Sequence, residues 1–242
     1  MIRKLFTGLI VVAAAGFGCA AFALLTLPDV RVLRTTNPAT TAFIELRQRE
    51  AESGGKKPRR LQTWVPYERI SSHLKRAVLV TEDAAFFQHD GIDIEELKKS
   101  LELNWKKGQF LRGGSTITQQ LAKNLYLSPS KNPVRKFREF LIARRLEAEL
   151  SKRRIFEIYL NVIEWGDGLY GAEAAARQYF RVPAASLGPE QSAMLASMIF
   201  NPRKYNPAQP TPFLQKRQQL ILPRMGTVTP PPADPPAPAP KT

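Results

Sequence analysis

Cysteine and histidine are nearly missing from this chain. Its 242 residues include one cysteine, Cys19, and two histidines, His73 and His89. A single cysteine excludes a disulfide framework within the chain and a cysteine-rich zinc site. Two histidines argue against a metal site built from imidazoles. The sequence therefore predicts no metal held by the protein's own side chains and no required cofactor.

Acidic residues are few in comparison with basic ones. The chain has 21 Asp and Glu against 36 Lys and Arg, a formal net charge of +15. Such a balance predicts a polyanionic partner, which could be nucleic acid, a phosphate group or an anionic membrane. The aromatic residues are not interleaved with the basic ones, as stacking platforms for bases would be. We therefore expect no nucleic-acid partner and attribute the charge to phosphates at a membrane surface.

Charged residues are absent between Leu5 and Leu27. A membrane-spanning helix needs about 20 consecutive apolar residues, and this run is long enough. Basic residues precede it, so residues 1–4 are expected to stay cytoplasmic and the rest of the chain to lie across the membrane. A cleaved signal peptide is the alternative, although the run is longer than the usual signal core. We expect residues 5–27 to form an uncleaved transmembrane anchor.

Strand patterns are scarce as well, and no internal repeat is visible. We expect a mainly α fold without a strand pair. Residues 28–63 read as a stalk or linker with one short helix, and residues 64–226 as a helical domain. The tail, residues 227–242, is rich in proline and alanine and is expected to be disordered.

Capping residues divide the helical domain into segments. Ser71 or Ser72 caps a first helix that we expect to end at Gly91. A helix beginning at Asn132 and Pro133 is expected to turn Phe137, Phe140, Leu141 and Leu146 toward the core. Further helices are expected over residues 94–105, from residue 116, from residue 151, and over residues 172–179 and 190–200.

Two carboxylates are candidates for acid–base chemistry. Glu82 lies at the edge of an apolar helical face, where partial desolvation would raise its pKa and improve it as a base near neutrality. The alternative is a solvated acid on a helix surface. Its neighbour Asp83 is expected to be a supporting hydrogen-bond acceptor. Glu139 lies in a strongly basic segment and is either one member of a salt-bridged surface or a second active-site carboxylate held ionised by cations.

The stretch from Gly113 to Asn124 has the composition of an anion site at a helix start. Glycines open it, Thr116 and Gln119 can form a capping box, and Lys123 follows two turns later. Gln119 and Gln120 offer amide groups suited to sugar hydroxyls. The alternative is a tight loop followed by a capped helix.

Five stretches in this order resemble the motifs of the peptidoglycan glycosyltransferases, glycosyltransferase family 51. They are Glu82 to Asp93, Gly113 to Asn124, Arg135 to Glu147, Tyr159 to Phe180, and Glu190 to Pro207. No transpeptidase-like sequence follows them, so the resemblance is to the monofunctional members of that family.

The resemblance implies a lysozyme-like helical domain with a smaller membrane-associated subdomain. It implies lipid II and the growing glycan chain as substrates, with inversion at the donor anomeric carbon and release of undecaprenyl pyrophosphate. Glu82 would be the general base, Glu139 a second essential carboxylate, and Lys123 would stabilise the pyrophosphate. The implied substrate-binding residues are Asp83, Ser115, Thr116, Gln119, Gln120, Lys123, Asn124, Lys131 and Arg135.

Three positions depart from the family's pattern, and one of them is Gln191, which stands where alanine is usual in the fifth motif. Lys131 stands where many members have arginine, which keeps the charge and loses the bidentate fork. Lys99 similarly replaces a basic residue of the donor cleft.

The resemblance also implies a cellular location and leaves alternatives open. The location is the bacterial inner membrane, with a single span and the catalytic domain on the periplasmic side. The implied partners are membrane lipids and other cell-wall synthesis and division proteins. A divalent cation, Mg²⁺ or Mn²⁺, could accompany the pyrophosphate. The alternatives are a lysozyme-like lytic enzyme and a catalytically silent scaffold of a wall-building complex.

Overall fold

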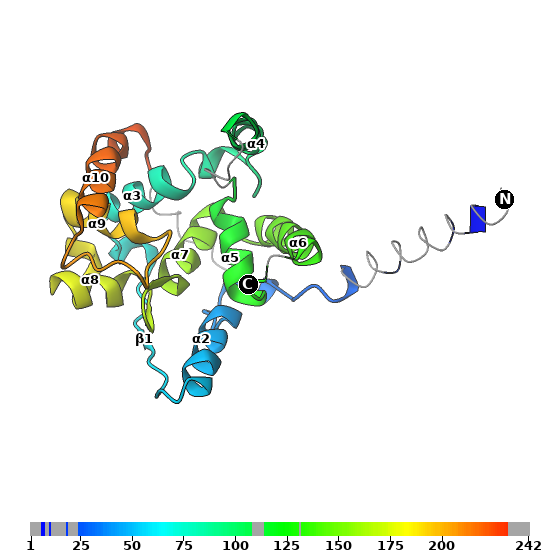
Figure 1. Ribbon diagram of the computed structural model, residues 1–242, viewed down its shortest axis with the longest axis horizontal. Helices are drawn as coiled ribbons and strands as arrows, with labels where there is room; N and C mark the ends of the chain where they lie inside the picture. The colour runs from blue at the N-terminus through cyan, green and yellow to red at the C-terminus, as the bar shows by residue number, and fades with distance from the viewer. Residues whose placement is uncertain are drawn as a thin grey trace, which may run out of the picture.

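The computed structural model describes residues 6–7, 10, 18, 24–107, 114–130 and 132–231. Within these residues the protein is mainly helical, as predicted (Figure 1). Among them, no helix combines the length and apolar character that a membrane crossing requires. The predicted anchor lies largely outside the described residues, and so does most of the predicted disordered tail.

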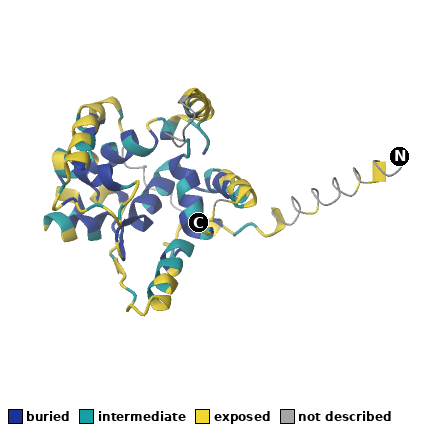
Figure 2. Ribbon diagram, in the orientation of Figure 1, coloured by how far each residue is buried: buried dark blue, intermediate teal, exposed yellow. Residues whose placement is uncertain are grey.

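Helices packed around α5 and α3 form the body of the domain (Figure 1). Helix α3 packs against α9, whereas α5 packs against α6, α7 and α2. The buried residues between them colour the inner parts of these ribbons dark blue in Figure 2. The helices are α2 (Ala42–Ser53), α3 (Ser72–Glu82), α4 (Ile94–Lys107), α5 (Ile117–Tyr126), α6 (Pro133–Glu149), α7 (Lys152–Val162), α8 (Ala172–Phe180), α9 (Pro189–Met198) and α10 (Pro212–Ile221).

The helix starts fall where the capping residues predict them. The side chains of Ser71, Thr116, Asn132 and Ser151 each accept a backbone N–H in the first turn of α3, α5, α6 and α7. These bonds satisfy donors that a helix N-terminus leaves without an intrahelical partner. Local sequence therefore fixes where these four helices begin.

The end of α3 differs from the prediction. The helix stops at Glu82 and not at Gly91, and Asp83 is its C-cap with φ −167° and ψ 81°. The side chain of Asp83 accepts the backbone N–H of Ile117, a bond across 34 residues. This contact draws the chain out of the helical path. Gly91 instead lies in a later turn with φ +83°.

The core face of α6 also differs from the prediction. Phe137 and Phe140 are 47% and 39% exposed, while Ile142, Ala143 and Leu146 are buried. The buried residues follow the i, i+1, i+4 spacing of one helical face, and the two phenylalanines lie outside it. The two phenylalanine rings stack on each other at the surface, with their centroids 6.5 Å apart.

A small sheet is present although no strand was predicted. Strands β1 (Leu61–Gln62), β3 (Leu169–Tyr170) and β2 (Glu164–Gly166) lie in that order, with β1 parallel and β2 antiparallel to β3. Two or three residues are too few to show the alternation by which a strand is recognised. The sheet joins residues before α3 to the loop after α7.

The segment expected to be a stalk is packed against the helical domain. Val30, Leu33 and Ile44 are buried, and α2 lies against α5. Arg34 also forms an ion pair with Glu149 at the end of α6, at 2.6 Å. Residues 30–53 therefore form part of the folded body and not a separate stalk, and α2 corresponds to the one short helix expected in this segment.

Candidate active site

A cleft of about 650 Å³ opens between the end of α3, α4, the start of α5 and the C-terminal helices. Its lining brings together residues from the first two motifs and from α10 and η5 (Leu222–Thr227). The charged residues in the lining are Glu82, Asp83, Asp93, Glu96, Lys99, Arg217 and Arg224. The four carboxylates thus all lie between residues 82 and 96, whereas two of the three cations, Arg217 and Arg224, come from the C-terminal end of the domain.

Glu82 is the last residue of α3 and is only partly exposed to solvent. Burial raises the pKa of its carboxyl group above the ordinary value of 4.5. A hydrogen bond from Gln120 and the charges of Arg217 and Lys123 oppose this rise, and Asp83 adds to it. The result is a carboxyl group whose pKa lies closer to neutrality, as a general base requires.

Gln120 lies between Glu82 and Tyr159. Its Nε2 donates a hydrogen bond to Glu82 Oε2 at 2.9 Å, and its Oε1 accepts one from the hydroxyl of Tyr159 at 2.9 Å. Tyr159 is completely buried. The amide that the sequence suggested for sugar hydroxyls is thus engaged with the candidate base.

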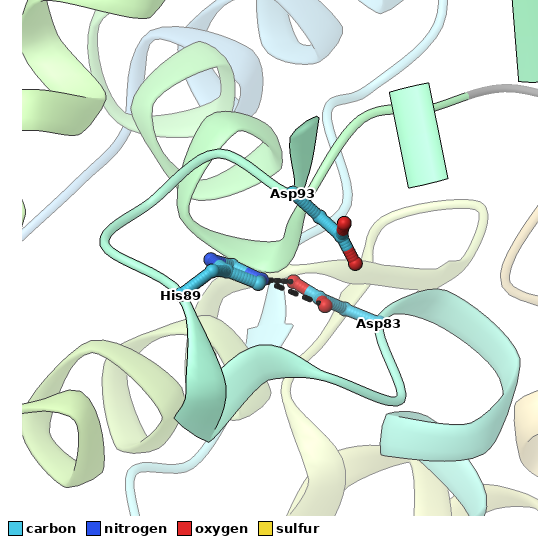
Figure 3. Close-up of side chains that lie close together, drawn as sticks. All are labelled: Asp83, His89 and Asp93. Carbon is cyan, nitrogen blue, oxygen red and sulfur yellow. Dashed lines mark hydrogen bonds and ion pairs between the residues drawn. The ribbon is translucent and has the colours of Figure 1, made fainter. Parts of the chain in front are cut away.

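Asp83 is buried and tied to two other segments. Its carboxylate accepts the N–H of Ile117 at 2.9 Å. The same carboxylate is bonded to His89 Nε2 at 3.0 Å (Figure 3). The expected role of Asp83 as a supporting acceptor agrees with these contacts. They fix the start of α5 relative to the end of α3, next to Glu82.

Asp83, His89 and Asp93 are also the described residues best placed to hold a cation. Each offers one ligand atom, and these atoms all lie within 4.8 Å of one another (Figure 3). Asp93 additionally accepts the backbone N–H of Glu96 at 2.7 Å and so caps α4. A divalent ion at this point would replace the hydrogen bond between His89 and Asp83.

The predicted capping box opens α5. Thr116 accepts the N–H of Gln119 at 3.2 Å, and the side chain of Gln119 accepts the N–H of Thr116 at the same distance. The Thr116 hydroxyl also donates to the carbonyl of Gly91 at 2.6 Å. Ser115 and Thr116 line the cleft, whereas Gln119 is buried and its oxygen is used by the box. Asn124 is buried too, and donates to the carbonyl of Gln120 at 2.8 Å.

Glu139 is buried on α6 between two cations. It forms ion pairs with Arg135 and Lys136, and Lys136 donates to the Ser115 hydroxyl at 3.0 Å. A chain of polar contacts therefore runs from the third motif to the cleft wall. Glu139 has the cationic surroundings expected for it.

Lys123 lies on α5 within the electrostatic reach of both carboxylates. Burial lowers the pKa of its ammonium group, while the charges of Glu139 and Glu82 raise it. Among the described residues, its ammonium group has no hydrogen-bond or ion-pair partner. The described lining of the cleft includes neither Lys123 nor Glu139. Lys131 lies outside the described part of the chain.

Sequence reasoning missed the C-terminal wall of the cleft. Arg217 on α10 donates to the carbonyl of Ser197 at 3.0 Å, and its guanidinium lies 4.5 Å from the ring centre of Phe200. Arg224 in η5 adds a second cation to the cleft. The signal was present, because Thr211 caps α10 and Pro212 occupies its first turn.

Fold and site together define a helical domain in which a half-buried carboxyl group faces cations across a cleft. The family described as transglycosylase matches residues 49–226 of this chain. The chain belongs to that transglycosylase family.

Three relatives show how close the similarity is. Each is named biosynthetic peptidoglycan transglycosylase. The relative from Dechloromonas aromatica (strain RCB) is 52% identical over 189 residues, which are 78% of this chain and 82% of the relative. The relative from Aromatoleum aromaticum is 52% identical over 195 residues, covering 81% and 84%. The relative from Nitrosospira multiformis is 49% identical over 193 residues, covering 80% and 84%.

Proposed function

We propose that this protein is a peptidoglycan glycosyltransferase that polymerises lipid II into glycan strands. The observation that carries the proposal is the half-buried Glu82, whose pKa is raised by burial and which faces the cations of a cleft. Membership of the transglycosylase family supports the reaction class. The substrate would be a sugar joined to a lipid through pyrophosphate.

In the proposed reaction Glu82 is the general base. It removes the proton from the acceptor sugar hydroxyl as that oxygen attacks the donor anomeric carbon. The bond to the lipid pyrophosphate breaks on the opposite face, so the configuration inverts. A carboxyl group with a raised pKa is a stronger base once ionised, which supports this assignment.

The cations around the site would stabilise the leaving pyrophosphate. Lys123 carries this role in the proposal, because its ammonium group has no described partner and lies within the field of Glu139 and Glu82. Negative charge grows on the leaving oxygens in the transition state, and fixed cations stabilise it there. Arg135 and Lys136, held by Glu139, extend the positive region toward Ser115. Glu139 is the proposed second essential carboxylate because it fixes these cations.

The remaining proposed substrate contacts are on the cleft wall and around it. Ser115, Thr116 and Asp83 line the cleft, and Lys99 adds a cation to it. Three further residues would act indirectly, through the protein groups that they bond: Gln119, Gln120 and Asn124. Lys131 is proposed as a further pyrophosphate ligand on sequence grounds alone.

A membrane setting is also part of the proposal. Much of helix α4 is exposed (Figure 2). Its exposed apolar residues include Ile94, Leu101 and Trp105, and Trp105 is 89% exposed. Phe137 and Phe140 of α6 are exposed as well. Such surfaces suit a subdomain that enters the outer leaflet beside a lipid-linked substrate. Residues 5–27 would anchor the protein in the bacterial inner membrane, with the catalytic domain on the periplasmic side.

The proposed reaction needs no cofactor. A divalent ion, Mg²⁺ or Mn²⁺, would be held chiefly by the pyrophosphate, with Asp83, His89 and Asp93 as the nearest candidate protein ligands. Other cell-wall synthesis and division proteins are the proposed protein partners.

Products from two substrates test the proposed reaction class. Purified full-length protein should convert lipid II into glycan polymers and should leave finished peptidoglycan uncut. Cleavage of peptidoglycan without polymer formation would identify a lytic enzyme. Inactivity toward both substrates would favour a silent scaffold.

A further inference from the structure

A second hollowed surface lies between strand β1 and helix α8, on the far side of the domain from α4 (Figure 1). One hollow there has a volume of about 340 Å³, and it shares Gln178 with a neighbouring hollow of about 240 Å³. Neither hollow shares a lining residue with the candidate active-site cleft. These two hollows together are named the β1–α8 groove, and the proposed polymerisation gives this groove no role.

Positive charge dominates the β1–α8 groove. Its described lining includes one carboxylate, Asp167, which pairs with Arg203 at 3.2 Å. Arg177 pairs with Glu173 at 2.6 Å, whereas four of the six lining cations have no carboxylate partner among the described residues. The six are Arg59, Arg60, Arg177, Arg181, Arg203 and Lys204. Because arginine binds carboxylates through two parallel hydrogen bonds, the groove suits a ligand with several carboxylates.

One wall of the groove is the free edge of the small sheet. Strand β1 is the end strand in the order β1-β3-β2, and the N–H of Leu61 donates to the carbonyl of Gly168 at 2.8 Å. Backbone groups alternate in direction along a strand, so those of Gln62 point to the edge where no further strand lies among the described residues. An edge of this kind can pair with another extended chain.

Both walls of the groove have regular structure. Gly168 has φ +65°, and a Cβ there would collide with the carbonyl oxygen of Arg59, so only glycine lets the start of β1 lie this close. On the other wall, residues spaced i, i+3, i+4 and i+7 share one face of α8: Ala174, Arg177, Gln178 and Arg181. Such walls need little reordering when a ligand binds.

We propose that the β1–α8 groove binds an acidic polypeptide segment in extended conformation. The backbone of this segment pairs with the free edge of β1 at Gln62, and its carboxylates bind the arginines on either side, among them Arg60 and Arg181. This inference goes beyond the proposed polymerisation of lipid II and does not depend on it.

Other occupants match the groove less well. The chain's own last residues, 232–242, contain one aspartate and one lysine, and a second copy of the chain would bring a net charge of +15. Anionic lipid headgroups would be met on the side of α4, which is the helix proposed to enter the membrane, and the groove lies away from it. A segment of a separate, acidic protein supplies both the charge and the extended backbone.

Fluorescence anisotropy with a labelled peptide of about eight residues, alternating glutamate and valine, tests the inference. Full-length protein in detergent should bind this peptide, and the affinity should fall as the salt concentration rises. The full-length variant Arg60→Gln/Arg181→Gln should bind the peptide about tenfold more weakly, because it lacks two cations that have no carboxylate partner. The same variant should polymerise lipid II at the wild-type rate.

Two controls separate the groove from general electrostatic attraction. Arg49→Gln/Arg69→Gln removes the same charge from exposed positions outside both hollows, and its affinity should stay within about twofold of the wild type. A probe with every backbone nitrogen methylated keeps all its carboxylates but cannot donate to the strand edge, and should bind the wild type about tenfold more weakly. This second comparison uses the unaltered protein and carries the test if the double variant fails to fold.

Absence of peptide binding by the wild type, an equal loss in both double variants, or equal affinity for the methylated probe would overturn the inference. So would tighter binding of a polyuronate that depends on Arg60 and Arg181, because this anionic polysaccharide has carboxylates without a peptide backbone. Binding with the expected pattern by a protein inactive toward lipid II would support the groove and refute the proposed function.

Discussion

At the scale of single residues, the Glu82 carboxyl group is subject to opposing influences. Burial favours its neutral form, whereas the Gln120 amide and the charges of Arg217 and Lys123 favour the ionised form. Burial has the largest effect, so the pKa is raised. The ionised form of such a base lowers the stability of the folded state at neutral pH, because the charge is poorly solvated there.

This cost predicts that Glu82→Gln stabilises the protein at neutral pH. The folded-state pKa lies above the unfolded one, so protonation stabilises the folded form, and that stability is lost as pH rises through the folded pKa. We expect the Tm of the variant to exceed that of the wild type by a few degrees at pH 7.5, since about 1 kcal/mol moves Tm by roughly 2–4 °C at this chain length. The difference should vanish at about pH 4, below the ordinary value of 4.5 for glutamate.

Thermal unfolding at both pH values measures this effect, with Glu95→Gln as the control. The Glu95 side chain is 73% exposed on α4, so its replacement should leave Tm unchanged at either pH. A Glu82→Gln variant that is less stable than the wild type at pH 7.5 would contradict the account of a desolvated base.

The residue scale also shows what sequence could and could not predict of the site. The spacing of apolar residues placed Glu82 at the margin of a buried face, and the structure has it half-buried there. The partners of Gln120 could not be predicted, because they lie 38 and 39 residues away and meet it only through the packing of three helices. The capped start of α10 was visible in the sequence, but the approach of Arg217 to the cleft depends on the same kind of packing.

At the scale of elements, the helix starts were predictable, whereas the end of α3 was not. Caps at Ser71, Thr116, Asn132 and Ser151 are local hydrogen bonds, so the sequence carries them. The end of α3 depends on a contact between Asp83 and α5, which no local pattern contains. The small sheet escaped prediction because its strands have only two or three residues.

The exposed apolar face of α4 gives a prediction at the same scale. If this helix enters the lipid, Trp105 should be quenched by brominated lipid tails when the full-length protein is reconstituted in vesicles. Replacing Trp105 by phenylalanine should remove most of the quenching. Trp64→Phe should remove little of it, because Trp64 packs against the protein core. Equal quenching in the wild type and Trp105→Phe would show that α4 does not meet the membrane.

At the scale of the whole molecule, part of the excess positive charge is concentrated around the cleft. Lys99, Arg217 and Arg224 line the cleft, and Arg135 and Lys136 surround Glu139 nearby. Cations gathered from separate parts of the chain around one cleft suit a compact, multiply charged group such as a lipid pyrophosphate. The transglycosylase match, which spans residues 49–226, includes every one of these residues.

The central claim is that Glu82 is the base of a lipid II polymerase, and the most direct test is the polymerisation rate of Glu82→Gln. Glutamine keeps the size of the side chain and its bond to Gln120 but cannot take a proton. The account predicts that kcat falls by about a hundredfold to ten-thousandfold, as for loss of a general base, while Glu95→Gln keeps the wild-type rate. A Glu82→Gln protein that polymerises lipid II as fast as the wild type would contradict the account.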